Sequence, residues 1–233
     1  MCGRYVSSST PDELARYFAA TGPAEVLEAN YNVAPTSPVY AVRGRGGHRH
    51  LDTLRWGLIP FWAKNRSVGS RMINARAESL ASKPAFRRPF ERRRCLIPAD
   101  GFYEWRRVPG QMAKQPYFIA RADGEPVAFA GLWERWSDPE QGDAAEAVVS
   151  CCIITTQANA DLAPVHDRMP VLLPPSAWDR WLDPDVRDVD QLAPLLVPAP
   201  EGLLQLRAVS PAVNNVRNQG PELLDAASAG PAR

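Results

Sequence analysis

The chain of 233 residues lacks the features that mark several large protein classes. No stretch approaches the roughly 20 consecutive apolar residues of a membrane-spanning helix, and neither a G-x-G-x-x-G nor a P-loop motif is present to bind a nucleotide cofactor. No signal peptide opens the chain, because Gly3, Arg4 and a run of serines follow the second residue. We therefore expect no membrane association and a cytoplasmic protein, or a nuclear one in a eukaryotic cell.

Cysteine and histidine are scarce, with four and three residues respectively. The cysteines form no C-x-x-C pair, and no histidine stands at metal-ligand spacing to a cysteine. This pattern argues against a disulfide framework and against a zinc site. We expect no metal and no cofactor.

The composition fits one globular domain. Hydrophobic residues make up 45% of the chain, enough for a sizeable core, and neither an internal repeat nor a linker divides it. Many short strand-like segments alternate with few helix signals, which predicts a single α+β domain whose antiparallel sheets form a barrel-like core with a few peripheral helices. We expect the domain to span residues 2–222, with a disordered tail at 223–233, and the protein to be a monomer.

The net charge of +1 conceals a strong asymmetry. Residues 41–107 hold sixteen Lys and Arg against five Asp and Glu, a balance of 16 − 5 = +11, whereas the rest of the chain holds eleven against twenty-one, a balance of 11 − 21 = −10. The densest runs are 86–88 and 92–94. A concentrated basic region indicates an anionic partner such as nucleic acid. The alternative is a set of arginines neutralised by acids from the rest of the fold.

The second residue carries the most distinctive chemistry. A cysteine after the initiator methionine is small enough for aminopeptidase processing, so we expect the mature chain to begin at Cys2. Its amine, with a reference pKa of about 7.7–8.0, and its thiol, at about 8.5, would then form a 1,2-aminothiol. Such a pair reacts with an aldehyde to give a Schiff base and then a thiazolidine ring. The alternative is that Cys2 is an incidental small residue at the start of a strand.

Other polar and aromatic residues are candidates for a site. Asn74 and Arg76 stand two apart, so they share one side of an extended segment, and Arg76 offers a planar fork for phosphate. Glu104, between Tyr103 and Trp105, is expected in a covered strand that raises its pKa into a useful acid–base range; the alternative is an edge glutamate paired with an arginine. His166 lies in a loop before a strand, where it is either a general acid–base group or a surface residue.

Together the motifs resemble those of the SRAP family, the SOS response-associated peptidases, understood as abasic-site processing proteins. The resemblance runs through MCGRY (1–5), YNVAPT (31–36), WGLIPFW (56–62), INARAE (73–78), CLIPADGFYEW (95–105), HDRMP (166–170) and VNNVRNQGPEL (213–223). It covers nearly the whole chain and implies a single α+β domain. One position departs from the pattern: Phe61 stands where relatives often carry a small residue such as serine.

The resemblance implies that Cys2 forms a covalent thiazolidine crosslink with the ring-opened aldehyde of an abasic site in single-stranded DNA and so shields it. It further implies that Asn74 orients the terminus and the sugar, that Glu104 transfers protons, and that His166 assists ring opening. An associated lyase activity, through β-elimination, and self-processing at Met1 are implied as well. The substrate would be single-stranded DNA or a junction with a short duplex, and would hold the protein near the nucleoid.

The implied DNA contacts are Arg4, Trp62, Arg76, Phe86, Trp105 and Arg168. Two other functions remain as alternatives. A class II glutamine amidotransferase also begins Met-Cys-Gly, but an Asn-Gly motif is expected there and this chain has none. A non-catalytic nucleic-acid-binding module would use the basic region and leave Cys2 and His166 without a role.

Overall fold

A closed ring of strands forms the centre of the molecule. The computed structural model describes residues 2–23, 25–110, 112–140 and 146–227. Antiparallel pairing links five strands in the order β5-β4-β7-β10-β11, and a parallel pairing of β11 with β5, at Ser150–Arg55 and Cys151–Trp56, closes the ring. The strands are β4 (Pro38–Arg45), β5 (His48–Trp56), β7 (Arg94–Ala99), β10 (Val127–Trp136) and β11 (Val148–Gln157). The expected α+β domain with a barrel-like core is thereby confirmed.

Four of the ring strands, β4, β7, β10 and β11, are buried on both faces along their apolar runs, whereas β5 alternates between buried and partly exposed residues. In β11 the side chains of Cys152 and Ile154 belong to a core cluster shared with the helices, whereas Cys151 and Ile153 belong to a second cluster. Alternating residues of a strand point to opposite faces, so a strand with both faces covered reads as a continuous hydrophobic segment. The second cluster lies between the ring and the other sheet.

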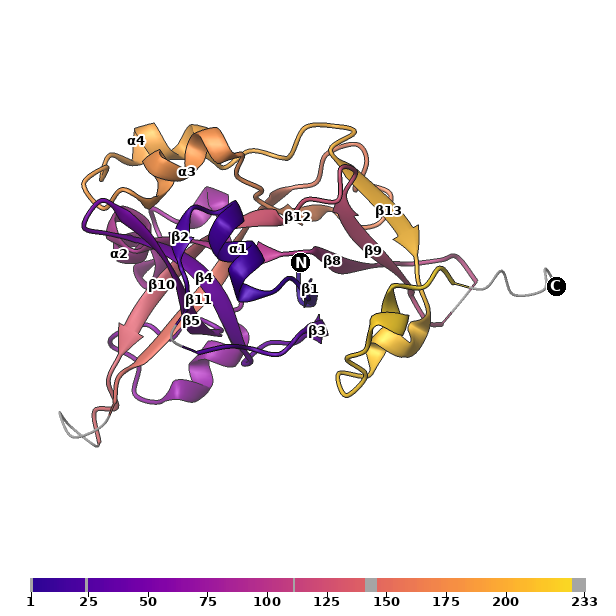
Figure 1. Ribbon diagram of the computed structural model, residues 1–233, viewed down its shortest axis with the longest axis horizontal. Helices are drawn as coiled ribbons and strands as arrows, with labels where there is room; N and C mark the ends of the chain where they lie inside the picture. The colour runs from indigo at the N-terminus through magenta and orange to yellow at the C-terminus, as the bar shows by residue number, and fades with distance from the viewer. Residues whose placement is uncertain (1, 24, 111, 141–145, 228–233) are drawn as a thin grey trace.

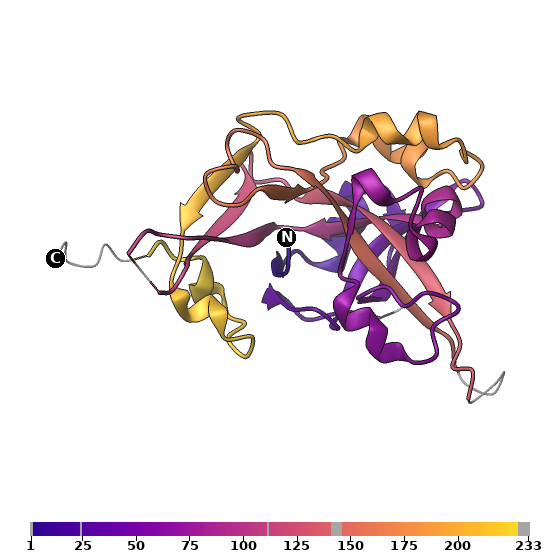
Figure 2. The ribbon, with the colours of Figure 1, turned by 180° about the vertical axis from the view of Figure 1, so that it is seen from behind.

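That other sheet has five strands in the order β13-β9-β8-β1-β3. Its inner face, through Phe102 and Ile119, packs on the ring, and its outer face, through Tyr103 and Phe118, packs under the C-terminal segment. Figures 1 and 2 show this segment, in yellow, beside the end of the sheet, with the N-terminus in the middle of the molecule. The strands are β1 (Tyr5–Ser7), β3 (Asn30–Val33), β8 (Gly101–Arg106), β9 (Gln115–Arg121) and β13 (Leu204–Ala208).

The turn at Asp100 joins the two sheets, because β7 belongs to the ring and β8 to the five-stranded sheet. The Asp100 carboxylate accepts hydrogen bonds from the backbone and hydroxyl groups of Ser8 and Ser9. Gly101 has φ +157°, and a Cβ there would lie 2.5 Å from the Phe118 ring. The turn therefore fixes where β8 begins relative to β1, and with it the position of Glu104.

Helices and short elements cover the ring. A capping box formed by Thr10 and Glu13 stands at the start of α1 (Pro11–Tyr17), and α3 (Pro175–Leu182) begins with a proline in its first turn. The other elements are α2 (Pro84–Arg92), α4 (Val189–Leu192), β2 (Ala20–Thr21), β6 (Asn74–Arg76), β12 (Arg168–Pro170), and the 3-10 helices η1 (Arg66–Arg71), η2 (Ala77–Ser79), η4 (Ala193–Leu195), η5 (Pro211–Asn214) and η6 (Pro221–Leu224).

Packing continues beyond residue 222, where the sequence placed the start of a tail. Leu223 is 1% exposed in the cluster under the outer face of the five-stranded sheet, and Ala226 forms an isolated bridge with Val209. Residues 228–233 lie outside the described residues. In the part of the chain that the structure describes, no helix has the length and apolar character needed to cross a membrane.

Candidate active site and nucleic-acid interface

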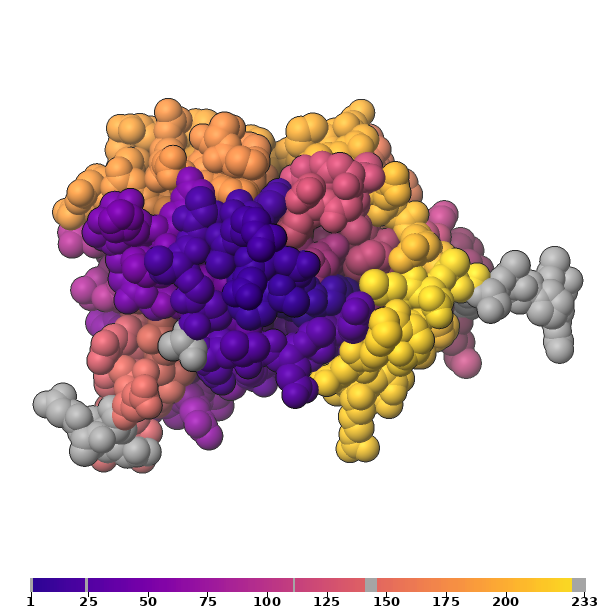
Figure 3. Space-filling view, viewed as in Figure 1, coloured from indigo at the N-terminus to yellow at the C-terminus, as the bar shows by residue number. Residues whose placement is uncertain are grey.

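Four predicted residues from distant parts of the chain converge where the five-stranded sheet meets the ring. Cys2 precedes β1 and Glu104 lies in the neighbouring strand β8, whereas Asn74 begins β6 and His166 precedes β12. β6 and β12 both pair with β11, so the ring brings Asn74 and His166 to one side of the site. The space-filling view shows the indigo N-terminal segment beside the yellow C-terminal segment on one face of the molecule (Figure 3).

Asn74 makes the direct contact between the two sides. β6 runs parallel to β11 with Asn74 opposite Ile153, and the Asn74 Nδ2 donates a hydrogen bond of 2.8 Å to the carbonyl of Cys2. The Asn74 Oδ1 is buried and has no hydrogen-bond partner among the described residues. An amide that holds the backbone of Cys2 through its nitrogen and keeps an acceptor oxygen available can orient both the chain terminus and a bound hydroxyl group.

The Cys2 side chain is fully buried in the cluster between the sheet and the ring. Burial raises the pKa of its thiol well above the ordinary value, and the nearby Glu104 carboxylate raises it further. At neutral pH the sulfur is therefore held as a thiol. A thiolate that attacks first does not fit this environment, whereas a thiol that reacts after another group has bound the substrate does.

Glu104 is 2% exposed, in agreement with the covered strand expected from its aromatic neighbours. Burial raises the pKa of its carboxyl group above the ordinary value, and the proximity of His166 acts in the opposite direction. A carboxyl group whose pKa is shifted upward by desolvation moves toward the range in which it can both accept and donate a proton. Glu104 and His166 are thus electrostatic neighbours in one site.

The His166 side chain is 24% exposed and its ring orientation is defined by the following residues. The Nδ1 atom accepts a hydrogen bond of 3.0 Å from the backbone N–H of Arg168, and the carboxylate of Asp167 also lies 3.0 Å from Nδ1. The backbone N–H of Arg168 needs an unprotonated Nδ1 as acceptor, whereas the carboxylate of Asp167 needs a protonated Nδ1 as donor. The backbone donor belongs to the first residue of β12, whereas the Asp167 side chain is 88% exposed and can turn to water. We therefore assign an unprotonated Nδ1 and a proton on Nε2.

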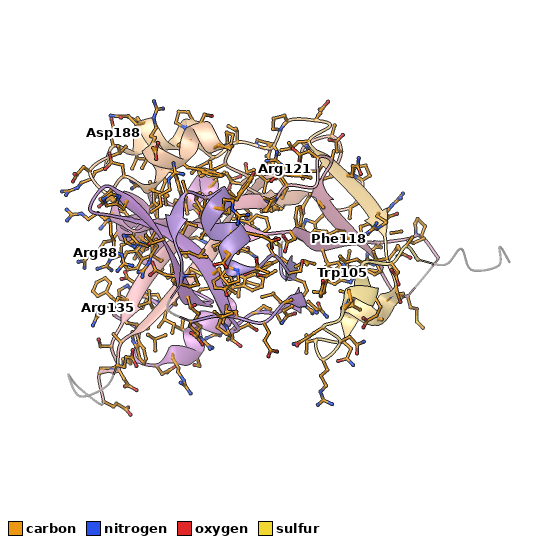
Figure 4. The ribbon with its side chains drawn as sticks, in the orientation of Figure 1. Arg88, Trp105, Phe118, Arg121, Arg135 and Asp188 are labelled. Atoms are coloured by element: carbon orange, nitrogen blue, oxygen red, sulfur yellow. The ribbon has the colours of Figure 1, made fainter. Side chains whose placement is uncertain are left out.

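Arg4 and Trp105 lie on the outer face of the sheet, away from the face that carries Glu104. The Arg4 guanidinium donates to the Oδ1 of Asn32 at 2.8 Å and to the carbonyl of Val213 at 3.0 Å, and it stacks 5.9 Å from the Trp105 ring. Trp105 Nε1 donates to the Oδ1 of Asn214 at 2.7 Å. Figure 4 shows Trp105 beside the C-terminal segment, far from Arg88 on the ring side. These residues form a charged aromatic surface next to the site.

Trp62 and Phe86 line a hollow of about 450 Å³ that also reaches Asn74, with Arg71 and Lys83 on its rim. Trp62 is 55% exposed, as a stacking platform requires, but Phe86 is only 5% exposed and mainly fills the core beneath α2. The exposed Phe61, the residue that departs from the family pattern, lies under the guanidinium of Arg88 at 5.0 Å. Arg76, at the end of β6, is exposed.

The basic run 92–94 is largely structural. Arg94 is 3% exposed, and its guanidinium donates to five backbone carbonyls around α2 and α3. Arg93 pairs with the buried carboxylate of Glu134 and stacks on Trp133. The alternative of arginines neutralised by acids thus holds for Arg93, whereas Arg94 is held by backbone carbonyls and Arg87, Arg88 and Arg92 remain exposed.

Two residues of the site region carried no prediction. Asn32 is fully buried, and besides accepting from Arg4 it donates through Nδ2 to the carbonyls of Val213, Asn215 and Asn218 at 2.8–3.2 Å. Glu78 forms a bidentate salt bridge with Arg168. Both stand inside quoted motifs, YNVAPT and INARAE, but their partners are far away in the sequence. Among the described residues, no three His, Cys, Asp or Glu side chains gather where they could hold a metal ion.

Comparison with known proteins shows which family the chain belongs to. The family model "SOS response associated peptidase (SRAP)" matches residues 1–216. The chain belongs to the SRAP family. It is 42% identical over 228 residues to the abasic site processing protein YoaM of Bacillus subtilis, covering 97% of this chain and 98% of that protein. It is 34% identical over 233 residues to the abasic site processing protein YedK of Escherichia coli, covering 96% and 99%.

Solved structures share the SRAP fold. A protein from Bacteroides thetaiotaomicron superposes with a TM-score of 0.85 over 97% of this chain and all of that chain, at 24% identity. A protein from Bordetella bronchiseptica gives a TM-score of 0.75 at 28% identity, over 90% of this chain and all of that one. The first likeness shows the fold alone. Cys2, Asn74, Glu104 and His166 all lie within the residues that the family model matches.

Proposed function

We propose that this protein processes abasic sites in single-stranded DNA by forming a covalent thiazolidine crosslink through Cys2. The observation that carries the proposal is the hydrogen bond of Asn74 to the Cys2 carbonyl, beside the buried carboxyl group of Glu104. This arrangement holds the backbone of residue 2 where its amine, once Met1 is removed, meets a proton-transfer group. Met1 lies outside the described residues, so its removal stays a prediction.

The chemistry proceeds from the amine to the thiol. The Cys2 amine adds to the aldehyde carbon of the ring-opened sugar, water leaves, and a C=N bond forms. The thiol then adds across that bond: a C–S bond forms, and the thiol proton moves to the nitrogen. The second step is intramolecular, for which effective molarities of about 10⁵ M or more are known. The raised thiol pKa is consistent with this order, because a neutral thiol does not compete with the amine for the aldehyde.

Glu104 and His166 divide the proton transfers. Ring opening of the sugar requires a proton to leave the anomeric hydroxyl and another to reach the ring oxygen. Loss of water from the carbinolamine requires an acid. Glu104 suits the second task because burial raises its pKa and so favours the protonated form. We assign sugar ring opening to His166, with Nε2–H as the donor. An associated lyase activity would follow if the Schiff base undergoes β-elimination before the ring closes.

The DNA strand is proposed to pass between the two aromatic surfaces. Trp62 and the hollow beside Asn74 lie on one side, and Trp105 with Arg4 lies on the other. Base stacking on such rings contributes about 1–3 kcal/mol per base without reading sequence. An abasic nucleotide has no base to unstack, so its entry into the site costs less than the few kcal/mol of ordinary base flipping. Single-stranded DNA and its junctions with duplex fit this path.

The deciding experiment uses purified protein and single-stranded DNA with one abasic site. We expect a covalent band on a denaturing gel that survives boiling, with a mass equal to the chain lacking Met1 plus the DNA minus water. Cys2→Ala should abolish this band, and the buried Cys95→Ala, a matched control, should retain it. The absence of a stable band with wild-type protein of confirmed Cys2 terminus would refute the proposal.

Two further assays on the same protein address the two alternatives. A binding module would shift abasic and intact DNA equally on a native gel and give no covalent band. An amidotransferase would release ammonia from glutamine in a Cys2-dependent reaction. Neither outcome is expected, because the site offers a buried acid and an oriented terminus next to an exposed aromatic and basic surface.

A further inference from the structure

Arg168 is not free to act as a simple phosphate contact. Its Nη1 and Nη2 donate to the two carboxylate oxygens of Glu78 at 2.6 and 2.9 Å, and Nη2 also donates to the carbonyl of Thr155 at 2.7 Å. The Arg168 side chain is 13% exposed, whereas that of Glu78 is 53% exposed. A bidentate salt bridge of this kind fixes the plane of the guanidinium and holds it more strongly than a single hydrogen bond does.

The position of Arg168 bears directly on the candidate acid–base group. The backbone N–H of Arg168 donates to the Nδ1 of His166 at 3.0 Å, and this contact decides which ring nitrogen carries the proton. Residue 168 also pairs with Gln157 at the end of β11. The side chain is thus anchored by η2 and β11 while the backbone of the same residue orients the imidazole.

We propose that Glu78 is a positioning residue that acts through Arg168 to hold His166 in the tautomer with its proton on Nε2. The inference rests on the proposed function for the role of His166 but concerns a residue to which that function assigns none. Glu78 lies in η2, directly after the strand that carries Asn74 and Arg76. One short segment, 74–78, therefore orients the terminus through its first residue and the imidazole through its last.

A different reading of the same contact makes a different prediction. If Glu78 merely occupies a phosphate site on Arg168, its removal frees a cation, strengthens DNA binding, and leaves the histidine unchanged. If it positions His166, its removal lets Arg168 and the backbone around it shift, and the imidazole loses its preference for one tautomer. Affinity and tautomer state therefore separate the two.

The first measurement needs no DNA. Protein labelled with ¹⁵N in its histidines is studied by long-range ¹H–¹⁵N spectroscopy, at a pH where the His166 ring is neutral, with His166→Gln to assign the signal. In the wild type we expect the shifts of an unprotonated Nδ1 and a protonated Nε2. In Glu78→Ala we expect both nitrogens to move toward averaged values, and Glu78→Gln, which keeps one hydrogen-bonding oxygen, should move less. Unchanged shifts in a folded Glu78→Ala protein overturn the proposal.

The second measurement uses the crosslinking rate at increasing concentrations of abasic DNA. We expect Glu78→Ala to lower the rate at saturation by about tenfold, as misorientation of a reacting group does, with half-saturation at the same or a lower DNA concentration. Glu125→Ala, which removes an exposed carboxylate from the β9–β10 turn, is the charge-matched control and should match the wild type. The double variant Arg168→Ala/Glu78→Ala should crosslink at the same saturated rate as Arg168→Ala alone, because Glu78 acts through Arg168. Tighter binding at an unchanged saturated rate contradicts the proposal.

Failure of the proposed function is distinguishable from failure of this inference. If wild-type protein forms no crosslink, the chemistry assigned to the site is wrong, whereas the tautomer measurement still tests the contact from Glu78 to His166. If crosslinking occurs and the tautomer does not respond to Glu78, the inference alone falls. If Glu78→Ala does not fold, Glu78→Gln supplies both readouts.

Discussion

The two faces of the five-stranded sheet carry different parts of the site. On the inner face Glu104 is 2% exposed and packs toward the ring beside the buried Cys2. On the outer face Arg4 and Trp105 are partly exposed and contact the C-terminal segment. Desolvation raises the pKa of the two acids Cys2 and Glu104 on the inner face, and the outer face offers a guanidinium group and an aromatic ring. In the proposed function, chemistry and DNA binding are therefore separated by one strand, β8, whose alternate residues serve each.

The arginines sharpen this contrast. Arg4 is held by neutral acceptors, the amide oxygen of Asn32 and the carbonyl of Val213, whereas Arg168 is held by the Glu78 carboxylate. In both side chains the Nε atom is buried and has no hydrogen-bond partner in the described part of the chain. A phosphate that approaches Arg4 meets an uncompensated positive charge, whereas one that approaches Arg168 must compete with Glu78. We therefore expect Arg4 to contribute more to DNA affinity.

The largest expected effect lies on the inner face. Glu104→Gln keeps the size of the side chain and removes its ability to exchange a proton, so the crosslinking rate at saturating DNA should fall by about 10²–10⁴-fold, the range for a general acid–base group. The DNA concentration at half-saturation should not change. A single-turnover gel assay measures both. If Glu104→Gln weakens binding and leaves the saturated rate intact, the two faces are not separated as described.

On the outer face, Arg4→Ala should weaken binding to single-stranded DNA and reduce the slope of log K against log salt concentration by about 0.7, the value for one phosphate contact. Asn32→Ala should reproduce this change, because the Oδ1 of Asn32 holds the guanidinium in place. Fluorescence anisotropy with intact DNA at several salt concentrations measures the slope, and Arg207→Ala on β13 serves as a charge-matched control. An unchanged slope in both variants would remove Arg4 from the phosphate path.

The raised pKa of Glu104 also predicts a dependence of stability on pH. Burial places this pKa above its value in the unfolded chain, so between the two values the folded protein binds more protons than the unfolded protein does. The contribution of Glu104 to stability must then fall as pH rises above the ordinary glutamic acid range. The difference in stability between Glu104→Gln and the wild type should therefore favour the variant more at about pH 8 than at about pH 4. The lower pH lies near the reference pKa of glutamic acid, about 4.3, and the higher pH lies well above it. Thermal unfolding of both proteins at the two pH values tests the sign.

Local signals predicted part of this arrangement. The aromatic neighbours of Glu104 indicated a covered strand, and the many short strand-like segments with few helix signals indicated the α+β domain. These features depend on residues a few positions apart, which the sequence displays directly. The convergence of Cys2, Asn74, Glu104 and His166 came from the family resemblance, because no local pattern specifies which strands lie side by side.

Features that depend on distant partners could not be predicted. The parallel pairing of β5 with β11 that closes the ring joins residues almost 100 positions apart, and periodicity does not reveal which strand is the neighbour. Arg94 appeared to be part of a surface charge cluster, yet its partners are carbonyls that α3 and the residues after it bring within reach. Asn32 finds its acceptors more than 180 residues away. In each case a polar group became buried because the fold supplied its partners.

The smallest expected effect tests whether the outer face is independent of the chemistry. Trp105→Phe keeps an aromatic ring and removes the hydrogen bond from Nε1 to Asn214. A typical hydrogen bond contributes about 0.5–1.5 kcal/mol to the free energy of unfolding, and this one belongs at the low end of the range because it is exposed. We expect a small loss of stability in urea unfolding and an unchanged crosslinking rate at saturation. Asn214→Ala should match it, since both variants break the same contact. A fall in the saturated rate in either variant would mean that the C-terminal segment, through Trp105, also sets the position of Glu104 on the opposite face of β8.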